Sequence, residues 1–512
     1  MKASDNLFSL IKSLTKSEKR YFKIIASKKS EDGKSNNYLQ LFNAIDKQEE
    51  YDEDKIIRQF SKATFIKHLP SEKNYLYFTI LKSLVLYHEG NLQFIELDEI
   101  RHCATILYNK GLYDQCNKML TKARKLAISY ELFPELLSVA KLQLELLPMI
   151  APSADDLKNG FEAMLNDEQL AFQKLENINQ YHKLYSKFLY LIRVNGELIR
   201  NETERNQFKE IMDNKLMKDE QYATCYKSKE IYFFITATYS FISGDLEHAY
   251  ESGLRGLAFL SSNLGKLTSV AIYSARLSNQ SEYCLRMGKF DECENLLEQL
   301  RNIETTSTLE KSKNFYRYHD LMLRLEIAKG NFEEALKWVQ PIEEGIMLYE
   351  ENIHMSRIIN MYYYIAYAYF GKGDYRTSLR WVSKIISNKT DLRSDILCFS
   401  RLLNLILHIE LDNQLQLEYV FKATYSYFSK RERLYKLEDY FLKFLKKSIT
   451  PLNPKTQRES FLSFKTELLQ QLNDPHEHRA LEYFDFISWL DSKIEGKPFM
   501  LVIQEKYEGE QH

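Results

Sequence analysis

The sequence predicts an all-α protein, an α-α superhelix in which antiparallel helix hairpins stack one after another along the chain. The main observation is a turn motif: a Gly, a small or charged residue, an aromatic residue or Leu, two polar residues and a small residue. It occurs as Gly244-Asp-Leu246-Glu-His-Ala249, Gly288-Lys-Phe290-Asp-Glu-Cys293, Gly330-Asn-Phe332-Glu-Glu-Ala335 and Gly373-Asp-Tyr375-Arg-Thr-Ser378. The glycines lie 44, 42 and 43 residues apart. A constant period of this length indicates stacked supersecondary units, a solenoid.

Length and composition agree with this prediction. A chain of 512 residues is too long for one compact core. Stacked hairpins do not need one, because each unit packs only on its neighbours. The chain contains 16 Gly and 9 Pro, which is few for this length and argues against β-rich or disordered alternatives.

Each turn motif is expected where one helix hands over to the next. Residues 360–370 contain no Gly or Pro, and apolar side chains recur there at helical spacing. Gly373 then ends the helix, because glycine takes a left-handed cap conformation without steric cost. The small residue that closes the motif, such as Ser378, is expected near the start of the second helix, where the two helices approach most closely.

The motif and its flanks resemble the tetratricopeptide-repeat family of helical hairpins. The similarity is greatest from Met361 to Ser378, and a further copy reads Gly111-Leu-Tyr113-Asp-Gln-Cys116. It covers residues 95–130 and 225–390, and the repeats are longer than the family's unit of about 34 residues. The resemblance implies a right-handed superhelix whose concave groove is lined by the first helix of each hairpin.

Three regions are expected. Residues 1–90 form an atypical helical cap: Thr15-x-x-Glu18 is a capping box that opens a helix. A polar loop from Ser27 to Asn37 separates it from two further helices at 38–62 and 72–88. Residues 91–447 form the solenoid, with degenerate units between Cys116 and Gly244 and a break at residues 151–155.

Residues 448–512 form closing helices and an apolar tail. Asn453-Pro454 and Asp474-Pro475 each place a capping side chain before a proline, so a helix is expected to begin at each. The last helix reaches Trp489 and ends at Gly496. The tail at residues 498–503 has strand-like residues and is expected to dock on its own chain, or else on a partner.

Charge and hydropathy limit the classes of protein. The net charge is −1, so no global field attracts nucleic acid or a membrane. The start of the chain lacks the apolar core of a secretion signal, and the apolar stretches are shorter than the about 20 residues of a membrane span. The prediction is a cytoplasmic protein whose six cysteines are reduced and mostly buried.

The sequence gives little indication of a catalytic site or a metal site. It lacks a glycine-rich phosphate loop, a nucleophile elbow and a His-Glu-x-x-His zinc motif. His476-Glu-His478 and the acidic run at residues 49–54 lack the ligand spacing of zinc and calcium sites and are expected to be a polar helix start and a solvated turn. We therefore expect no enzyme, no cofactor and no metal.

The function indicated is a protein-protein interaction scaffold that binds a peptide or protein in its concave groove. The family resemblance implies that residues about thirteen, ten, six and three positions before each motif glycine face this groove. The contact residues predicted from Gly330 and Gly373 are Arg317, Arg324, Tyr363, Tyr367 and Phe370. Tyr and Arg often carry binding energy, and Arg clamps carboxylates, so an acidic partner is expected. The alternative interpretation is that these tyrosines pack against an adjoining unit.

Two basic segments support an alternative prediction. In this alternative the protein is a nucleic-acid-binding transcriptional regulator with a helical N-terminal domain and a repeat sensor domain. One segment spans residues 12–29, and the other spans residues 430–447, where aromatic residues alternate with lysines and arginines. In the second segment the aromatic residues also fit a core-facing helix side, which predicts an ordinary solvated basic face.

Overall fold

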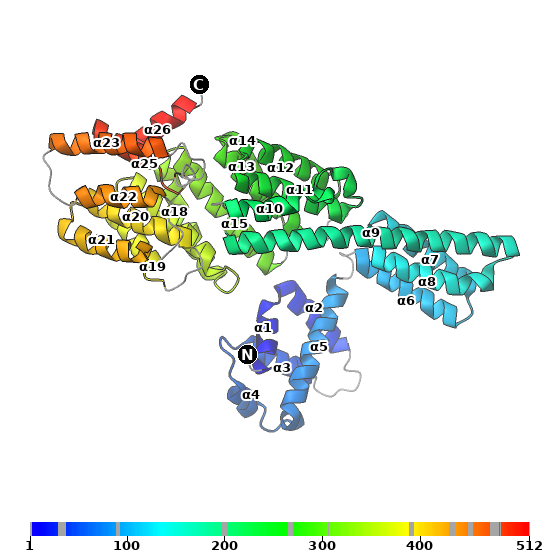
Figure 1. Ribbon diagram of the computed structural model, residues 1–512. Coiled ribbons are helices and arrows are strands. Elements are labelled where there is room, and N and C mark those ends of the chain that lie inside the picture. The colour runs from blue at the N-terminus through cyan, green and yellow to red at the C-terminus, as the bar shows by residue number, and fades with distance from the viewer. Residues whose placement is uncertain are drawn as a thin grey trace. The chain divides into compact units, whose positions relative to one another are not determined.

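All the regular structure in the described residues is helical, and most helices pack on the next one along the chain. The computed structural model describes residues 3–28, 37–88, 93–195, 202–264, 270–305, 307–388, 394–429, 436–448, 454–471, 481 and 483–510. Figure 1 shows the succession of helices along the chain. The prediction of an all-α chain of sequentially packed helices is confirmed.

The chain divides into two compact units, unit 1 (Met1–Glu176) and unit 2 (Asn177–His512). The sequence boundaries at 90 and 447 do not coincide with this division. The first helices of unit 1 are α1 (Ala3–Ser13), α2 (Lys16–Lys28), α3 (Asn37–Asp46), α4 (Glu53–Gln59) and α5 (Leu69–His88), with a 3-10 turn at Thr64–His68 before α5. They enclose an apolar core that includes Leu7, Ile11, Phe22, Phe42 and Leu76.

The capping box forms as predicted at the start of α2. The backbone N–H of Thr15 donates to the Glu18 carboxylate (2.7 Å), and the N–H of Glu18 donates to Thr15 Oγ1 (3.2 Å). The helix expected at 38–62 is instead two helices, α3 and α4. They separate where Asp52 caps α4 by accepting a hydrogen bond from the N–H of Lys55. The acidic run at 49–54 therefore serves as a turn and helix start, as expected.

The second part of unit 1 contains α6 (Gln93–Asn109), α7 (Tyr113–Ser129), α8 (Phe133–Ile150) and the first half of α9 (Ala154–Asn195). The break predicted at 151–155 separates α8 from α9. Of the degenerate units expected between Cys116 and Gly244, the α7–α8 pair is present, but α9 is one continuous helix of 42 residues in place of further hairpins. It lies beside α7 and α8 in Figure 1, and Arg124 of α7 forms an ion pair with Asp167 of α9.

Unit 2 continues with helix pairs that follow the turn motif. Its helices after α9 are α10 (Glu202–Met212), α11 (Tyr226–Ser243), α12 (Leu246–Ser261), α13 (Val270–Arg286), α14 (Phe290–Arg301), α15 (Thr308–Ala328), α16 (Phe332–Lys337), α17 (Val339–Leu348), α18 (Met355–Gly371), α19 (Tyr375–Ile386), α20 (Ser394–Glu410) and α21 (Gln414–Ser429). The small residues that close the four motifs are all fully buried. Ser378 Oγ, for example, donates to the carbonyl of Ala366 on the preceding helix (2.7 Å).

The motif glycines have the left-handed conformation that the sequence predicts, with φ between +71° and +88°. Two more turns have a residue other than glycine in this left-handed conformation: Glu131 (φ +55°) between α7 and α8, and Asp412 (φ +49°) between α20 and α21. After both glycine and non-glycine turns, the next N–H reaches back five residues, from Asp374 to Tyr369 O and from Asn413 to His408 O (both 3.0 Å). The sequence motif therefore missed a hairpin whose turn residue is Asp412.

Replacing Gly373 by Val is expected to lower the free energy of unfolding of unit 2 by about 2 kcal/mol, since a β-branched residue is strained at positive φ. No atom lies within 4 Å of an added Cβ at Gly373, so the cost comes from the backbone and not from a clash. Urea unfolding followed by tryptophan fluorescence measures it. Gly509→Val, in a helical position that is equally open, is the matched control. Equal stability of the two variants would contradict the turn assignment.

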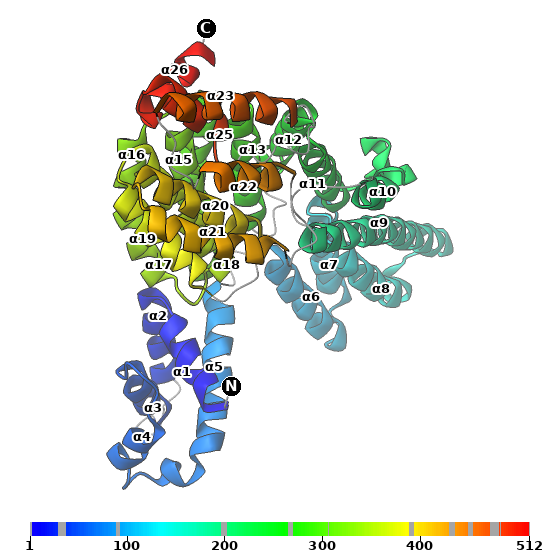
Figure 2. The same cartoon turned by 60° about the vertical axis from the view of Figure 1, so that its left-hand side comes forward.

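The C-terminal helices of unit 2 are α22 (Lys436–Ser448), α23 (Pro454–Gln471), α25 (Phe486–Glu495) and α26 (Phe499–Glu510). Figure 2 shows α25 and α26 next to α23. The predicted start at Pro454 and the predicted end at Gly496 (φ +72°) are confirmed. Asp474-Pro475 lies outside the described residues. The tail is helical and not strand-like, but it docks on its own chain as expected, with Phe499 against Phe332.

Candidate functional site

A cavity of about 340 Å³ opens in unit 2 on the face formed by the first helices of successive hairpins. We call it the arginine cavity. It is lined by the C-terminal part of α9, by α11, α13, α15 and α18, and by Tyr483. None of its lining residues comes from the second helices α12, α14, α16 or α19.

The lining residues recur in the same register before each motif glycine. Residues six positions before Gly244, Gly288 and Gly330 are Thr238, Glu282 and Arg324, and all three line the cavity. Those ten positions before the same glycines, Phe234, Ser278 and Asp320, also line it. The register predicted from the family resemblance therefore identifies the cavity-facing side of α11, α13 and α15.

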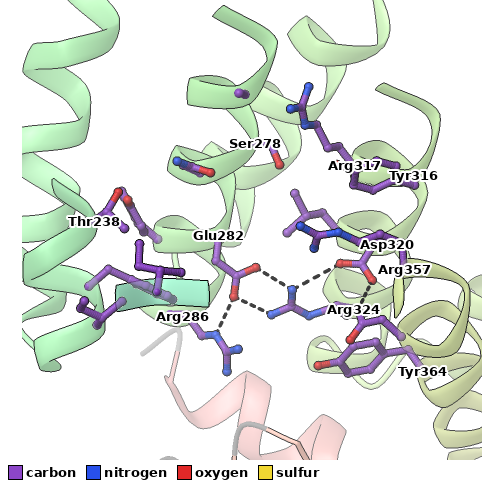
Figure 3. Close-up of a pocket in the computed structure, with 18 of the residues that line it drawn as sticks. Thr238, Ser278, Glu282, Arg286, Tyr316, Arg317, Asp320, Arg324, Arg357 and Tyr364 are labelled. Carbon is purple, nitrogen blue, oxygen red and sulfur yellow. Dashed lines mark hydrogen bonds and ion pairs between the residues drawn. The ribbon is translucent and has the colours of Figure 1, made fainter. Parts of the chain in front are cut away.

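An ion-pair network spans two of these helices (Figure 3). The guanidinium of Arg324 on α15 donates to both carboxylate oxygens of Glu282 on α13, at 2.5 and 2.6 Å. Arg286 Nε donates to Glu282 at 2.8 Å. Arg324 also lies 3.5 Å from Asp320, which accepts a hydrogen bond from Asn360 of α18. The side chains of Arg324 and Glu282 are only 11% and 20% exposed, so this bidentate pair is well shielded from water.

The two carboxylates of the network have opposite pKa shifts. Burial alone would raise the pKa of Glu282, but the charges of Arg324 and Arg286 outweigh it and hold the pKa far below its ordinary value. Burial raises the pKa of Asp320, and the charges of Arg324 and Arg357 and the hydrogen bond from Asn360 do not compensate. Glu282 is thus a firmly ionised carboxylate that neutralises the buried guanidinium of Arg324.

Two other arginines of the cavity form no ion pair within the described part of the chain. Arg317 on α15 makes a long hydrogen bond to Asn314 (3.4 Å), lies beside the ring of Tyr316 and is influenced by the charge of Glu310. Arg357 on α18 lies over the ring of Tyr316, 5.2 Å from its centroid. Burial lowers the pKa of Arg317, an effect that a bound anion would oppose. Figure 3 shows Arg317, Tyr316 and Arg357 on the same side of the cavity.

The cavity is therefore electropositive. Its charged lining residues are Arg286, Arg317, Arg324 and Arg357 against Glu282 and Asp320. Glu282 and Asp320 contact Arg324, whereas the guanidinium groups of Arg317 and Arg357 form no ion pair with a described carboxylate. They flank an aromatic ring that adds apolar contact area.

The five predicted contact residues divide into two sets. Arg317 and Arg324 line the cavity. Tyr363, Tyr367 and Phe370 need correction, because they are buried beneath the chain's own segment 483–499 and do not form an open surface. Tyr363 OH donates to the carbonyl of Tyr483 (3.0 Å), and Tyr367 OH accepts from the N–H of Asp485 (3.1 Å).

Sequence reasoning missed three residues of the site. Glu282 follows the register that identified Arg324, applied to Gly288. Arg357 lies one helical turn before Asn360, the first groove position predicted from Gly373. Tyr316 carries no such signal, since it lies one residue outside the predicted register.

The other candidate sites have ordinary structural roles where the structure describes them. In the second basic segment, Phe428 and Phe441 are buried, so they offer no surface for stacking bases. Residues 430–435 and both histidines of His476-Glu-His478 lie outside the described residues. Cys103 is an exposed thiol, and the other five cysteines are buried thiols.

The described residues contain no group of three His, Cys, Asp or Glu side chains that would hold a metal ion. No helix in the described ranges is both long and apolar enough to cross a membrane. A comparison of the sequence with protein-family models found no match, and neither did a comparison with curated proteins.

Proposed function

We propose that the protein is a non-catalytic interaction scaffold, and that its arginine cavity binds an acidic segment of a partner protein. The observation that carries the proposal is the pair of guanidinium groups, Arg317 and Arg357, that flank Tyr316 and form no ion pair with any carboxylate of the described residues. Nearby Arg324 is fixed by Glu282, so the cavity retains a positive charge for a ligand.

The proposal includes a tetratricopeptide-like right-handed superhelix with this cavity in its concave groove. It is supported by the hairpin register, since residues six and ten positions before successive motif glycines reach one cavity from successive helices. Contacts of α13 with α15, and of α15 with α18, place these first helices side by side. Stacking of this kind produces the extended inner surface that repeat proteins use for binding.

The chemistry of the site favours a carboxylate-bearing peptide. Each arginine can form two parallel hydrogen bonds to a carboxylate, and a partly desolvated site strengthens them. The volume of about 340 Å³ accommodates a few side chains of an inserted segment and not a folded domain. The cavity carboxylates are engaged, Glu282 by two arginines and Asp320 by Asn360 and Arg324, so their role is to position the guanidinium groups.

The test is a fluorescence-anisotropy titration with labelled acidic and basic peptide pools of matched length. We expect the acidic pool to bind. The double variant Arg317→Gln/Arg357→Gln is expected to weaken its binding at least about 30-fold, since each charged hydrogen-bond partner contributes on the order of 1–2 kcal/mol. Arg376→Gln/Arg380→Gln, which removes two exposed guanidinium groups from α19, is the matched control. Equal binding of both pools, or unchanged binding by the cavity variant, would overturn the proposal.

A further inference from the structure

Helix α2 of unit 1 has one side fixed in a core and the other side open. Leu14 and Thr15 form a two-residue connection from α1, and the capping box fixes the first turn of α2. Phe22 and Ala26 are buried in the core, with the ring of Phe22 4.7 Å from that of Phe42. Contacts with α3 and α5 complete this support. The helix is thus presented rigidly, with a defined outer face.

The outer face of α2 is a basic stripe. It comprises Lys16, Lys19, Arg20, Lys23, Ile24 and Ser27, which line one shallow surface depression. Their spacing of three and four residues places them on one side of the helix. Lys19 is paired with Asp46 at 2.6 Å, and Lys23 lies over the ring of Phe42. Lys16 and Arg20 are exposed and have no acidic partner in the described ranges.

The charge is concentrated at this end of the chain. Residues 3–28 contain six Lys and Arg against two Asp and Glu, and Glu18 is held in the capping box. Residues 1–88 have a formal charge of +5, although the whole chain has a charge of −1. An asymmetry of this sign favours a polyanionic partner.

The side chains of the basic stripe indicate which kind of polyanion it is suited to bind. Single-stranded nucleic acid requires aromatic rings on which bases stack, and the stripe contains none. A membrane-surface helix requires a broad apolar face, whereas the one large apolar side chain of the stripe is Ile24. Lysine and arginine at helical spacing on a rigid helix match the phosphates of duplex DNA, whose major groove of about 12 Å admits an α-helix.

We propose that α2 binds the phosphate backbone of duplex DNA through Lys16, Arg20 and Lys23, without dependence on base sequence. This inference is independent of the arginine cavity, since it concerns residues of unit 1 alone. With three phosphate contacts, log K is expected to fall with log salt with a slope of about −2.7. That slope corresponds to a loss of about 40-fold between 50 mM and 200 mM salt.

The experiment is a fluorescence-anisotropy titration of the full chain against a labelled duplex of mixed sequence, at several salt concentrations. We expect Lys16→Gln/Arg20→Gln/Lys23→Gln to lose most of the affinity and to reduce the magnitude of the salt slope by about 2–3. Lys110→Gln/Lys118→Gln/Lys125→Gln removes three exposed charges elsewhere in unit 1 and is expected to bind like the wild type. Because Lys23 contacts Phe42, the double variant Lys16→Gln/Arg20→Gln serves as a second probe that leaves the core contact intact.

Equal losses in the α2 variant and the control variant would overturn the proposal, because they would indicate a diffuse charge effect. Tighter binding to a labelled single strand or to vesicles of anionic lipid than to the duplex would also overturn it. Retained duplex binding by the double and triple variants would exclude α2 as the contact.

Discussion

Glu282→Gln is expected to lower the free energy of unfolding of unit 2 by about 3 kcal/mol, because it leaves Arg324 shielded from water without a counter-charge. The wild-type carboxylate accepts three hydrogen bonds from Arg324 and Arg286. A glutamine has the same shape but no charge, and it offers one acceptor oxygen. The loss measures how strongly the network holds the cavity in its present form.

Tryptophan fluorescence during urea unfolding is suited to this measurement, since Trp338, Trp381 and Trp489 all belong to unit 2. The matched control is Glu298→Gln on α14, an exposed carboxylate 3.8 Å from Arg301, for which we expect less than about 1 kcal/mol. A loss as small for Glu282 as for Glu298 would contradict the assignment of a strong network.

The effect of Glu282 also has a defined pH dependence. The pKa of Glu282 is lowered in the folded chain. The contribution of Glu282 to the free energy of unfolding is therefore fully present above the ordinary pKa of 4.5 and is lost as the pH falls below that value. The stability difference between wild type and Glu282→Gln is therefore expected to be constant down to about pH 4.5 and to shrink below it. Asp320 also contributes to this difference, because the charge of Glu282 is one cause of the raised pKa of Asp320 and is missing from the variant.

Trp489→Ala is expected to cost about 3–5 kcal/mol, the usual range for truncating a fully buried Trp. Trp489 on α25 packs against Phe441 and Phe461, and its Nε1 donates to Glu410 of α20 (2.8 Å). These contacts hold α25 against α20, α22 and α23. The variant therefore tests whether α25 is an integral part of unit 2.

Two measurements test the effect of Trp489→Ala. Urea unfolding, reported by the remaining tryptophans, gives the stability loss, and amide hydrogen exchange of residues 483–510 gives the local opening. Leu415→Ala is the control, since the Leu415 side chain is 93% exposed and its loss is expected to be near zero. Wild-type protection of residues 483–510 in the Trp489 variant would show that α25 is not needed for docking.

Local sequence signals predicted the hairpins well. A glycine at positive φ and a small residue at a close helix approach are each dictated by short-range sterics, so Gly373 and Ser378 could be placed from the turn motif alone. The signal failed where other residues adopt the same backbone conformation, as Asp412 does. It also failed at α9, where an uninterrupted helix replaces the expected hairpins.

The candidate site was predictable only in part. Whether a predicted surface is open or covered depends on contacts between segments that are far apart in the sequence, and local patterns do not report such contacts. The register before each glycine identified residues of α11, α13 and α15 that line the arginine cavity. No local pattern indicated that residues 483–499 cover Tyr363, Tyr367 and Phe370, which lie more than a hundred positions earlier. The aromatic side chains at those positions pack against this segment, whereas Arg317 and Arg324 line the cavity.

Site-specific photo-cross-linking tests the central claim most directly, namely that partners enter the arginine cavity. A benzoylphenylalanine residue would replace Ser278, which lines the cavity, or Arg376, which is exposed on α19, and each protein would be irradiated in a lysate of the source cells. We predict a discrete cross-linked partner from position 278 that disappears with Arg317→Gln/Arg357→Gln, and none from position 376. Cross-links from position 376 alone, or cross-links from position 278 that persist in the arginine variant, would contradict the account.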